Sequence, residues 1–453
     1  MARGRALVAL CVVWAGALLA LASAAAPAPA PPASCGSDGH ANLNAIVTDA
    51  PTLLTTSTNG KKFQVAGVSP PLTVLHVYGS PYEMGHAYGT LMKSEINDLV
   101  PQVMAYIDGQ IAPYIKFLPP AWQKAIENWG INVALNLTID AVKPYVAPEF
   151  VQEMQGVADG AGLTLNKIFQ LAVFPELIQA ACSMFGAWGP ATQQSRGGDL
   201  VQLRALDWTT DGPFQQYPVV IVYHPAGSTG SDGGGGAAGH AYSVLTWAGL
   251  VGSITGMSSA QTGICEKVWI HYKGSKPRNG IPFTFLLRDI LQYDNTVDEA
   301  VARIEGANRT CSIFVGVGDN KAKTFRGIEY SHDEVNVYDD KNFPAYPPYH
   351  NLSAGLVFFD KHTQPDNNAC MGDLLGQYYG DIDPLNTLQR ITSVFQTGDM
   401  HIAIYDYQQQ TMYVSNASPM IGGNASTVVK AYDRPFVKLD MKAAFDEPAP
   451  TAQ

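Results

Sequence analysis

The sequence predicts an α+β protein in which layered sheets and helices share a core. Two observations lead to this prediction. From Tyr82 to about Gln170, apolar residues recur at three- and four-residue steps, which is the period of an amphipathic helix. From Cys182 onward, short runs rich in β-branched and aromatic residues alternate with further helical stretches. Helices first, then strands with helices interspersed, is an order typical of α+β folds.

Composition supports a large folded core and excludes one class of partner. Of the 453 residues, 46% are apolar and only 15% are charged, so intrinsic disorder is excluded for the bulk of the chain. The net charge of −11 comes without any cluster of Lys and Arg, and phosphate binding needs such clusters. We therefore expect no nucleic acid partner.

The N-terminus predicts export from the cytosol. A short basic segment, Met1–Arg5, precedes an apolar run from Ala6 to Ala22, and Ala22-Ser23-Ala24 is a small-residue cleavage site. A membrane anchor is the alternative, but the run is short and an Ala/Pro-rich stretch follows it instead of basic residues. We predict a signal peptide over residues 1–24 and a secreted or lysosomal protein. Five Asn-x-Ser/Thr sequons suit that compartment, at Asn136, Asn308, Asn351, Asn416 and Asn424.

The helical part of the chain is punctuated by residues that begin or end helices. Pro101 is expected to kink the first long helix, and Gly160-Ala-Gly162 predicts a helix end. The capping box Thr296-Val-Asp-Glu299 predicts the start of a later helix. The helical stretches expected after the first are 121–142, 148–158, 165–173, 282–306 in two pieces, and 387–395.

The strand predictions begin beside Cys182 and continue to a late hairpin formed by 401–405 and 411–415. The other predicted strands are 200–208, 217–224, 242–246, 251–257, 263–272, 311–317, 324–330, 334–337 and 355–359.

The cysteine count is odd once the signal peptide is removed. Five cysteines remain, namely Cys35, Cys182, Cys265, Cys311 and Cys370. In an oxidising compartment four can pair, in any of three ways, and one thiol stays free. The spacings contain no Cys-x-x-Cys pair and no His/Cys cluster, so we expect no structural zinc site.

Common hydrolase signatures are absent. The chain has no Gly-x-Ser-x-Gly elbow and no His-Glu-x-x-His helix. Its ten histidines are scattered, and a lone one such as His271 or His401 is expected to be a packed or surface residue.

The one local group of reactive residues surrounds Cys182, where helix gives way to strand. Downstream lie Arg204 and Asp207, in Arg204-Ala-Leu-Asp207-Trp208 on a predicted strand. Arg204 would favour the thiolate by its charge, and Asp207 could orient a nitrogen that carries a proton. Because strand side chains alternate, positions 204 and 207 would need a bulge or a strand end to converge.

Two interpretations of this group remain open. In the catalytic one, cleavage of the Ala181–Cys182 bond frees an α-amino group, with a pKa of about 7.7–8, that serves as the general base. In the structural one, Cys182 is a buried or disulfide-bonded cysteine, and Arg204 and Asp207 form a surface ion pair.

A family resemblance favours the catalytic interpretation. Cys182-Ser183 followed by Arg204-Ala-Leu-Asp207-Trp208 resembles the signature of the acid ceramidase and acylethanolamine amidase group of N-terminal-nucleophile (Ntn) hydrolases. The stretch from Trp247 to Gly256, followed by Glu266, resembles their glycine-rich sheet segment. Residues 153–162 are similar to the helix before the nucleophile in penicillin acyltransferase-type (C45) peptidases. The likeness runs from Tyr78 to Ala417.

The resemblance implies a fold and a set of roles. It implies an αββα sandwich with a mostly helical N-terminal region, and self-cleavage that divides the chain into an α chain, 25–181, and a catalytic β chain, 182–453. Cys182 would then attack the substrate's amide carbonyl, Arg204 and Asp207 would position and activate it, and Glu266 would be a fourth site residue. No metal or organic cofactor is implied.

One element of the family pattern is missing. The family places an oxyanion asparagine in a Thr-Asn-Tyr/His stretch, for which only Tyr349-His350-Asn351 and Asp360-Lys-His362 compete here. Asn351 also opens a sequon, and a glycosylated residue cannot line a catalytic pocket.

The resemblance also implies disulfides and a substrate class. By analogy with the interchain bridge of acid ceramidase we expect Cys35–Cys370, which would link the α and β chains. We expect Cys265–Cys311 as the second bridge because each lies in a predicted strand and the two could meet across a sheet edge. The implied function is hydrolysis of N-acylated lipids of the ceramide or N-acylethanolamine type, with transient contact to a membrane surface. The alternatives are a C45-type acyltransferase or peptide amidase, and a catalytically silent lipid-binding glycoprotein.

Overall fold

The computed structural model describes residues 29–110, 124, 130–177, 180–228, 239–364, 367–419 and 428–451. The predicted signal peptide and the sequon at Asn424 lie outside the described residues.

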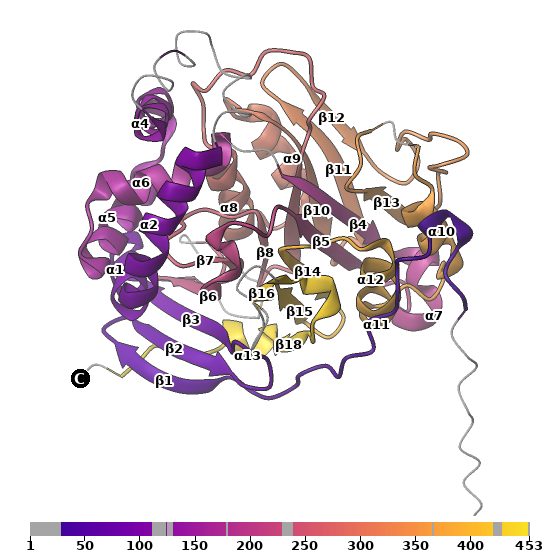
Figure 1. The fold of residues 1–453 in the computed structure, drawn as a ribbon, viewed down its shortest axis with the longest axis horizontal. Coiled ribbons are helices and arrows are strands. Elements are labelled where there is room, and N and C mark those ends of the chain that lie inside the picture. Colours follow the sequence, from indigo (N-terminus) through magenta and orange to yellow (C-terminus); the bar gives the residue numbers. More distant parts are fainter. Residues whose placement is uncertain are drawn as a thin grey trace, which may run out of the picture.

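Two large sheets pack face to face and form the centre of the molecule (Figure 1). In the ten-stranded sheet only β3 and β6 run parallel; all other neighbours are antiparallel, as are all strands of the six-stranded sheet. Gly186 lies where the sheets meet, and a Cβ there would come within 2.2 Å of the Phe325 ring on the other sheet. The sheets therefore touch through a position that only glycine fits.

The order of the ten-stranded sheet is β1 (Thr52–Ser57), β2 (Gly60–Val65), β3 (Leu72–Gly79), β6 (Pro218–Pro225), β7 (Tyr242–Trp247), β8 (Thr255–Ser258), β9 (Thr262–Val268), β10 (Ser312–Asp319), β11 (Thr324–Ser331) and β12 (Val335–Tyr338). The order of the six-stranded sheet is β13 (Leu356–Phe359), β4 (Ala181–Ala187), β5 (Val201–Asp207), β14 (His401–Asp406), β15 (Thr411–Asn416) and β18 (Val437–Asp440). A small pair, β16 (Ser418–Pro419) and β17 (Val428–Val429), lies outside both sheets.

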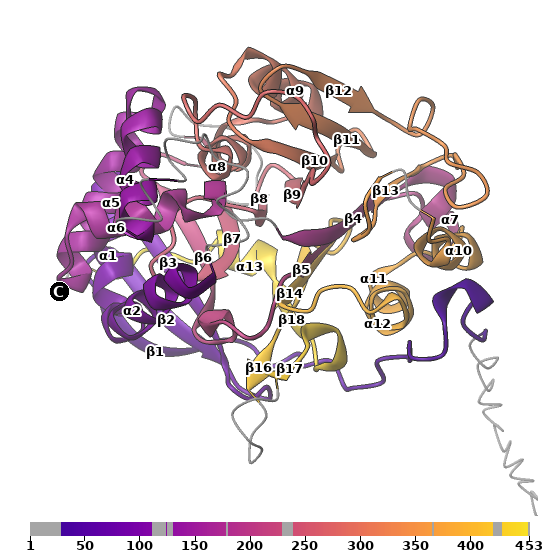
Figure 2. The ribbon, with the colours of Figure 1, turned by 45° about the horizontal axis from the view of Figure 1, so that its top comes forward.

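Helices cover the outer face of each sheet, as Figure 2 shows. Over the ten-stranded sheet lie α1 (Pro81–Leu91), α2 (Lys93–Gln110), α4 (Ile131–Val142), α5 (Pro148–Ala161), α6 (Leu165–Val173), α8 (Phe283–Tyr293) and α9 (Val297–Gly306). On the side of the six-stranded sheet lie α7 (Gln193–Arg196), α10 (Cys370–Gln377), α11 (Pro384–Asn386) and α12 (Thr392–Phe395). The C-terminal α13 (Met441–Phe445) contacts β6 of one sheet and β15 and β18 of the other. The predicted αββα sandwich is confirmed.

The N-terminal helices follow the sequence signals closely. Ser80 caps α1 in a reciprocal capping box with Glu83, and Gly162, with φ 77°, ends α5 as predicted. Helices α1 and α5 approach closely because glycines line their contact, and a Cβ on Gly85 would lie 2.1 Å from the Glu153 carbonyl oxygen. The three strands β1–β3 that precede these helices were missed, so strands lie before α1 where none was predicted.

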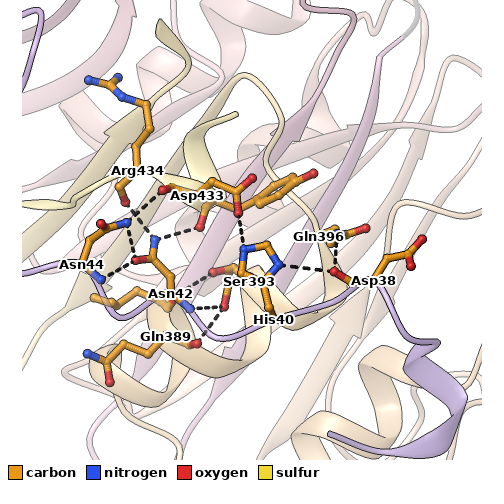
Figure 3. A network of polar contacts seen from close by, with 12 residues as sticks. Asp38, His40, Asn42, Asn44, Gln389, Ser393, Gln396, Asp433 and Arg434 are labelled. Carbon is orange, nitrogen blue, oxygen red and sulfur yellow. Dashed lines mark hydrogen bonds and ion pairs between the residues drawn. The ribbon is translucent and has the colours of Figure 1, made fainter. Parts of the chain in front are cut away.

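The N-terminal segment runs to the α10 side of the molecule, opposite α1 and α2 (Figure 1), and Figure 3 shows its polar contacts. The Asn42 amide donates to the carbonyl oxygens of Tyr432 and Arg434, each at 2.8 Å. His40 lies 3.1 Å from Asp433. Residues of the predicted α and β chains are thus tied by polar contacts over this surface.

Candidate active site

Cys182 is the second residue of β4 and is fully buried. Strand β4 pairs with β5 so that Cys182 lies opposite Leu206 and Met184 lies opposite Arg204. Side chains on one face of a sheet recur every second residue, so these four side chains share the face turned toward the ten-stranded sheet. The thiol of Cys182 and the guanidinium of Arg204 therefore point into the space between the sheets.

Arg204 joins the thiol to Glu266. Its guanidinium is fully buried, forms a hydrogen bond with Cys182, and lies 3.4 Å from Glu266 Oε2. Its Nε donates to the carbonyl oxygen of Ile254 at 3.4 Å. The other oxygen of Glu266, Oε1, is buried and has no hydrogen-bond partner among the described residues. A buried carboxylate oxygen without a partner is costly, and such atoms mark places where a ligand group can bind.

Burial sets the charge states in this cluster. It raises the pKa of the Cys182 thiol to about 12, against the opposing pull of Arg204. It also raises the pKa of Glu266 to about 7, although Arg204 and then Lys267 act in the other direction. In the uncleaved chain the thiol is neutral at any physiological pH, and Glu266 changes charge near neutrality.

Asp207 does not converge with Arg204. Strand β5 has no bulge, and Asp207 lies at its last position, opposite Ala181, with its side chain on the opposite face from Arg204. Its Oδ2 accepts from the Thr397 hydroxyl at 2.5 Å, and its Oδ1 accepts from the Gly398 backbone N–H at 2.9 Å. Burial nevertheless raises the pKa of Asp207 to about 6. Asp207 thus lies opposite Ala181 with its carboxylate on one face of the sheet, while Arg204 contacts the Cys182 thiol on the other face.

A small apolar cavity adjoins the cluster. It has a volume of about 60 Å³, enough for a few water-sized groups. Glu266 and Leu206 line it together with aromatic and aliphatic side chains from the helical layer and from residues 246–254. Phe174, Pro175 and Ala180, which precede the Ala181–Cys182 bond, also line it. The cavity therefore has an apolar lining with one carboxyl group, and residues just before Cys182 form part of its wall.

His401, which the sequence predicts to be a packed or surface residue, is buried in this region. It lies opposite Leu206 in the register of β14 and β5, on the face that carries Cys182. Its Nε2 is 2.9 Å from the Thr255 hydroxyl, and its buried Nδ1 has no partner among the described residues. Burial, with Arg204 adding to the effect, holds the pKa of His401 well below its ordinary value. The ring is therefore neutral, and only strand pairing across 195 residues of chain could reveal its position.

Neither candidate for the family's oxyanion asparagine presents an amide to Cys182. Asn351 is exposed, and its neighbour His350 is buried in an ion pair with Asp360 at 3.3 Å. Lys361 follows β13 alongside β4 and donates from Nζ to the Gln396 carbonyl oxygen at 2.7 Å. Neither stretch therefore supplies the asparagine of the family pattern beside Cys182.

One of the two predicted disulfides is present. Cys35 and Cys370 are bonded across a sequence separation of 335 positions, as predicted. The prediction of Cys265–Cys311 is wrong, because both are free and buried. The β9–β10 register pairs Cys265 with Gly316, far along the strand from Cys311, and the Cys265 thiol faces Gln202 of the other sheet. A disulfide cannot span that separation.

The sequons differ in accessibility. Asn136, Asn308 and Asn351 are exposed, whereas Asn416 is only 8% exposed at the end of β15. Asn416 is therefore a poor acceptor for a glycan.

Membrane-spanning helices and metal-binding clusters are both absent from the part of the chain that the structure describes. None of the described helices is long and apolar enough to cross a membrane. No group of three or more His, Cys, Asp or Glu among the described residues is arranged to hold a metal ion.

Comparison with known proteins gives two strong matches. The chain is 41% identical over 427 residues to Protein dcd1A of Dictyostelium discoideum, which spans 91% of this chain and 94% of that protein. It is 38% identical over 419 residues to Protein dcd1B of the same organism, over 89% of this chain and 81% of that protein. No family model matches. Among solved structures it is similar to an N-acylethanolamine-hydrolyzing acid amidase ortholog of Caenorhabditis elegans, with 16% identity and a TM-score of 0.36, over 50% of this chain and 93% of that one.

Proposed function

The chain belongs to the family of the Dictyostelium discoideum proteins dcd1A and dcd1B, and we propose that it is a self-processing amidohydrolase whose nucleophile is Cys182. The observation that carries the proposal is the buried cluster of Cys182, Arg204 and Glu266 beside an apolar cavity. The Arg204 cation lies against the Cys182 thiol, and Glu266 has an unpartnered oxygen next to the apolar lining. This arrangement suits a substrate whose acyl chain lies in the cavity and whose amide group reacts with the thiol.

The first step would be cleavage of the chain itself. The Cys182 sulfur attacks the carbonyl carbon of Ala181, the C–N bond breaks, and the nitrogen of Cys182 takes a proton to become a free amine. Water then hydrolyses the thioester and leaves a carboxylate on Ala181. The position of Asp207 opposite Ala181 puts a carboxylate beside the bond that would break. The products are the proposed α chain, 25–181, and β chain, 182–453.

Processing would also supply the missing general base. The new α-amino group, with a pKa of about 7.7–8, can accept the thiol proton as the sulfur attacks the substrate carbonyl. Arg204 would stabilise the developing thiolate, and Asp207 would hold the amine. Glu266 would offer its unpartnered oxygen to the amide or to the leaving amine. The amine product departs first, and hydrolysis of the thioester releases the acid.

We propose an N-acylated lipid of the ceramide or N-acylethanolamine type as the substrate, because the cavity lining is mainly apolar. A volume of about 60 Å³ holds only the carbonyl end of an acyl chain. Phe174, Pro175 and Ala180 form part of the wall, so release of the segment before Cys182 would enlarge it. Such a lipid would be taken from a membrane surface in the secreted or lysosomal compartment. The Cys35–Cys370 bond would keep the two chains linked.

The decisive experiment is N-terminal sequencing and intact mass after incubation at acid pH. The wild-type protein should give a fragment that begins at Cys182, and Cys182→Ala should stay whole because alanine cannot accept the acyl group. Cys311→Ala is the matched control, since Cys311 is also free and buried but directly precedes β10 instead of following the bond that would be cleaved. An uncut wild type, or a Cys182→Ala protein cut at the same bond, would refute self-processing and favour a silent lipid-binding protein. If cleavage occurs, transfer of the acyl group to added amines, in preference to water, would identify an acyltransferase.

A further inference from the structure

A three-residue turn, residues 396–398, binds both oxygens of the Asp207 carboxylate. Thr397 donates its hydroxyl to Oδ2, and Gly398 donates its backbone N–H to Oδ1, so both oxygens are bonded from consecutive residues. The turn connects α12 to the segment that enters β14. Neither Thr397 nor Gly398 shares a motif with Cys182 or Asp207, and more than 180 residues separate them in sequence.

The backbone of this turn is held in one conformation. Gln396 has φ 55° and Gly398 has φ 90°, both in the left-handed region. A Cβ on Gly398 would lie 2.2 Å from a side-chain carbon of Ile402, so only glycine fits there. Conformations of this kind persist only where surrounding contacts impose them, and they gather at functional sites. The two donors are therefore fixed in place before any substrate arrives.

The Thr397 hydroxyl also connects Asp207 to the strand of the nucleophile. Its oxygen lies 2.6 Å from the hydroxyl of Ser183, the residue that follows Cys182. Since Thr397 uses its single hydrogen for the carboxylate, the Ser183 hydroxyl donates to Thr397. The result is a buried chain from Ser183 to Thr397 to Asp207 in which each hydroxyl donates once.

Two hydrogen bonds to Gln396 hold the turn in place, one from Lys361 and one to the N-terminal segment. Lys361 donates from Nζ to the Gln396 carbonyl oxygen at 2.7 Å. The Gln396 side chain donates to the Asp38 carbonyl oxygen at 3.1 Å, and Figure 3 shows this contact at the end of the polar network. Asp38 follows Cys35, whose disulfide fixes the N-terminal segment. Contacts from the proposed α chain thus support the turn.

We propose that Thr397 is a positioning residue for the reaction of Cys182, because it orients the Asp207 carboxylate and keeps it ionised beside the nitrogen of Cys182. This inference rests on the proposed function. The charged groups that act on Asp207 are Lys361, which favours its ionised form, and Asp399, which opposes it and is itself paired with Lys430 at 3.2 Å. The remaining titratable neighbour is the Cys182 thiol on β4.

The physical effect of removing the hydroxyl has a definite sign. Hydrogen bonds to a carboxylate favour its ionised form, and burial already raises the pKa of Asp207 to about 6. Thr397→Val keeps the shape and removes the donor, so the pKa of Asp207 should rise further. A hydrogen bond to a charged group corresponds to a shift of about one to two pH units. The acidic limb of any reaction that needs ionised Asp207 should move up by that amount.

The test compares the rate of Ala181–Cys182 cleavage between pH 4 and pH 8 in the full-length chain. Thr397→Val should shift the acidic limb upward by about one to two pH units, while Thr397→Ser, which keeps the hydroxyl, should retain the wild-type profile. Lys361→Met should shift the acidic limb in the same direction, whereas Lys361→Arg, which keeps the positive charge, should retain the wild-type profile. A Thr397→Val profile identical to wild type, or a uniform loss at every pH, would overturn the positioning role.

A second measurement separates this inference from the proposed function. In the uncleavable Cys182→Ala chain, Thr397→Val should lower the thermal midpoint more at pH 8 than at pH 4, because the penalty falls on ionised Asp207. The difference between pH 8 and pH 4 in the effect of Thr397→Val on the thermal midpoint should disappear when Asp207 is also replaced by Asn. If wild type never self-cleaves but this difference is present, the proposed function fails and the interaction of Thr397 with ionised Asp207 stands. If wild type self-cleaves and the difference is absent, only the inference about Thr397 fails.

Discussion

Replacing Glu266 by Gln should flatten the pH dependence of stability. Burial raises the pKa of Glu266 from the ordinary 4.5 to about 7. A carboxyl group whose pKa is higher in the folded state stabilises the protein fully below its unfolded pKa, and this contribution is lost as pH rises through the folded pKa. With 1.36 kcal/mol per pH unit, Glu266 should cost about 3 kcal/mol of the free energy of unfolding between pH 4.5 and pH 8. Glutamine keeps the shape and stays neutral, so this loss should vanish.

The assay is the thermal midpoint from pH 4 to pH 8 in the uncleavable Cys182→Ala chain, so that processing does not mix species. Glu266→Gln should nearly match its parent at pH 4.5, where Glu266 is protonated, and exceed it at pH 8. Glu305→Gln is the control, because Glu305 is a solvent-exposed carboxylate at the end of α9. If Glu266→Gln shows the same pH dependence as its parent, or is less stable at pH 8, then Arg204 holds Glu266 ionised and the assigned charge states are wrong.

Two further predictions concern the cavity and the disulfide. Leu250→Trp places a larger side chain in the apolar lining and should lower kcat/KM for long N-acyl amides about tenfold or more relative to an N-acetyl amide. Leu352→Trp, at a site that is 45% exposed, is the control and should leave this ratio of kcat/KM values unchanged. An unchanged ratio in Leu250→Trp would exclude the cavity as the acyl site. Cys35→Ser and Cys370→Ser should each lower stability by about 2–4 kcal/mol, measured as a drop in the thermal midpoint. The double variant should lose no more stability than either single variant, because each substitution already removes the same bond. A larger loss in the double variant would mean that the two cysteines stabilise the protein separately.

The sequence predicted those parts of the fold that depend on local signals. The Ser80 cap was not singled out, but the helix end at Gly162 and the strand that carries Arg204 and Asp207 follow from residue pattern and turn chemistry. The strands β1–β3 were missed although β3 is rich in β-branched and aromatic residues. Their edge strand β1 is largely exposed, so it lacks the buried alternation that makes a strand recognisable.

The parts of the site that the sequence could not provide are those set by pairing between distant strands. The second disulfide was predicted from the idea that two strand cysteines could meet at a sheet edge. The register decides otherwise, because β9 and β10 are neighbours but Cys265 pairs with Gly316. The whole hydrophobic pattern of both strands sets the register, so the presence of one cysteine in each strand does not show that the two lie opposite each other. His401 was likewise treated as an isolated histidine, yet its strand lies next to β5.

The alternation of side chains on β5 explains why Arg204 and Asp207 serve one residue without touching each other. The three-residue spacing sends the guanidinium to the sulfur of Cys182, and the carboxylate to the face behind its backbone nitrogen. An N-terminal nucleophile needs both groups, because the sulfur attacks while the nitrogen carries the proton. A side chain outside the strand must then fix the carboxylate, and Thr397 has that position. In the proposed mechanism this two-faced arrangement follows from placing a nucleophile and its base on the same residue at the start of a strand.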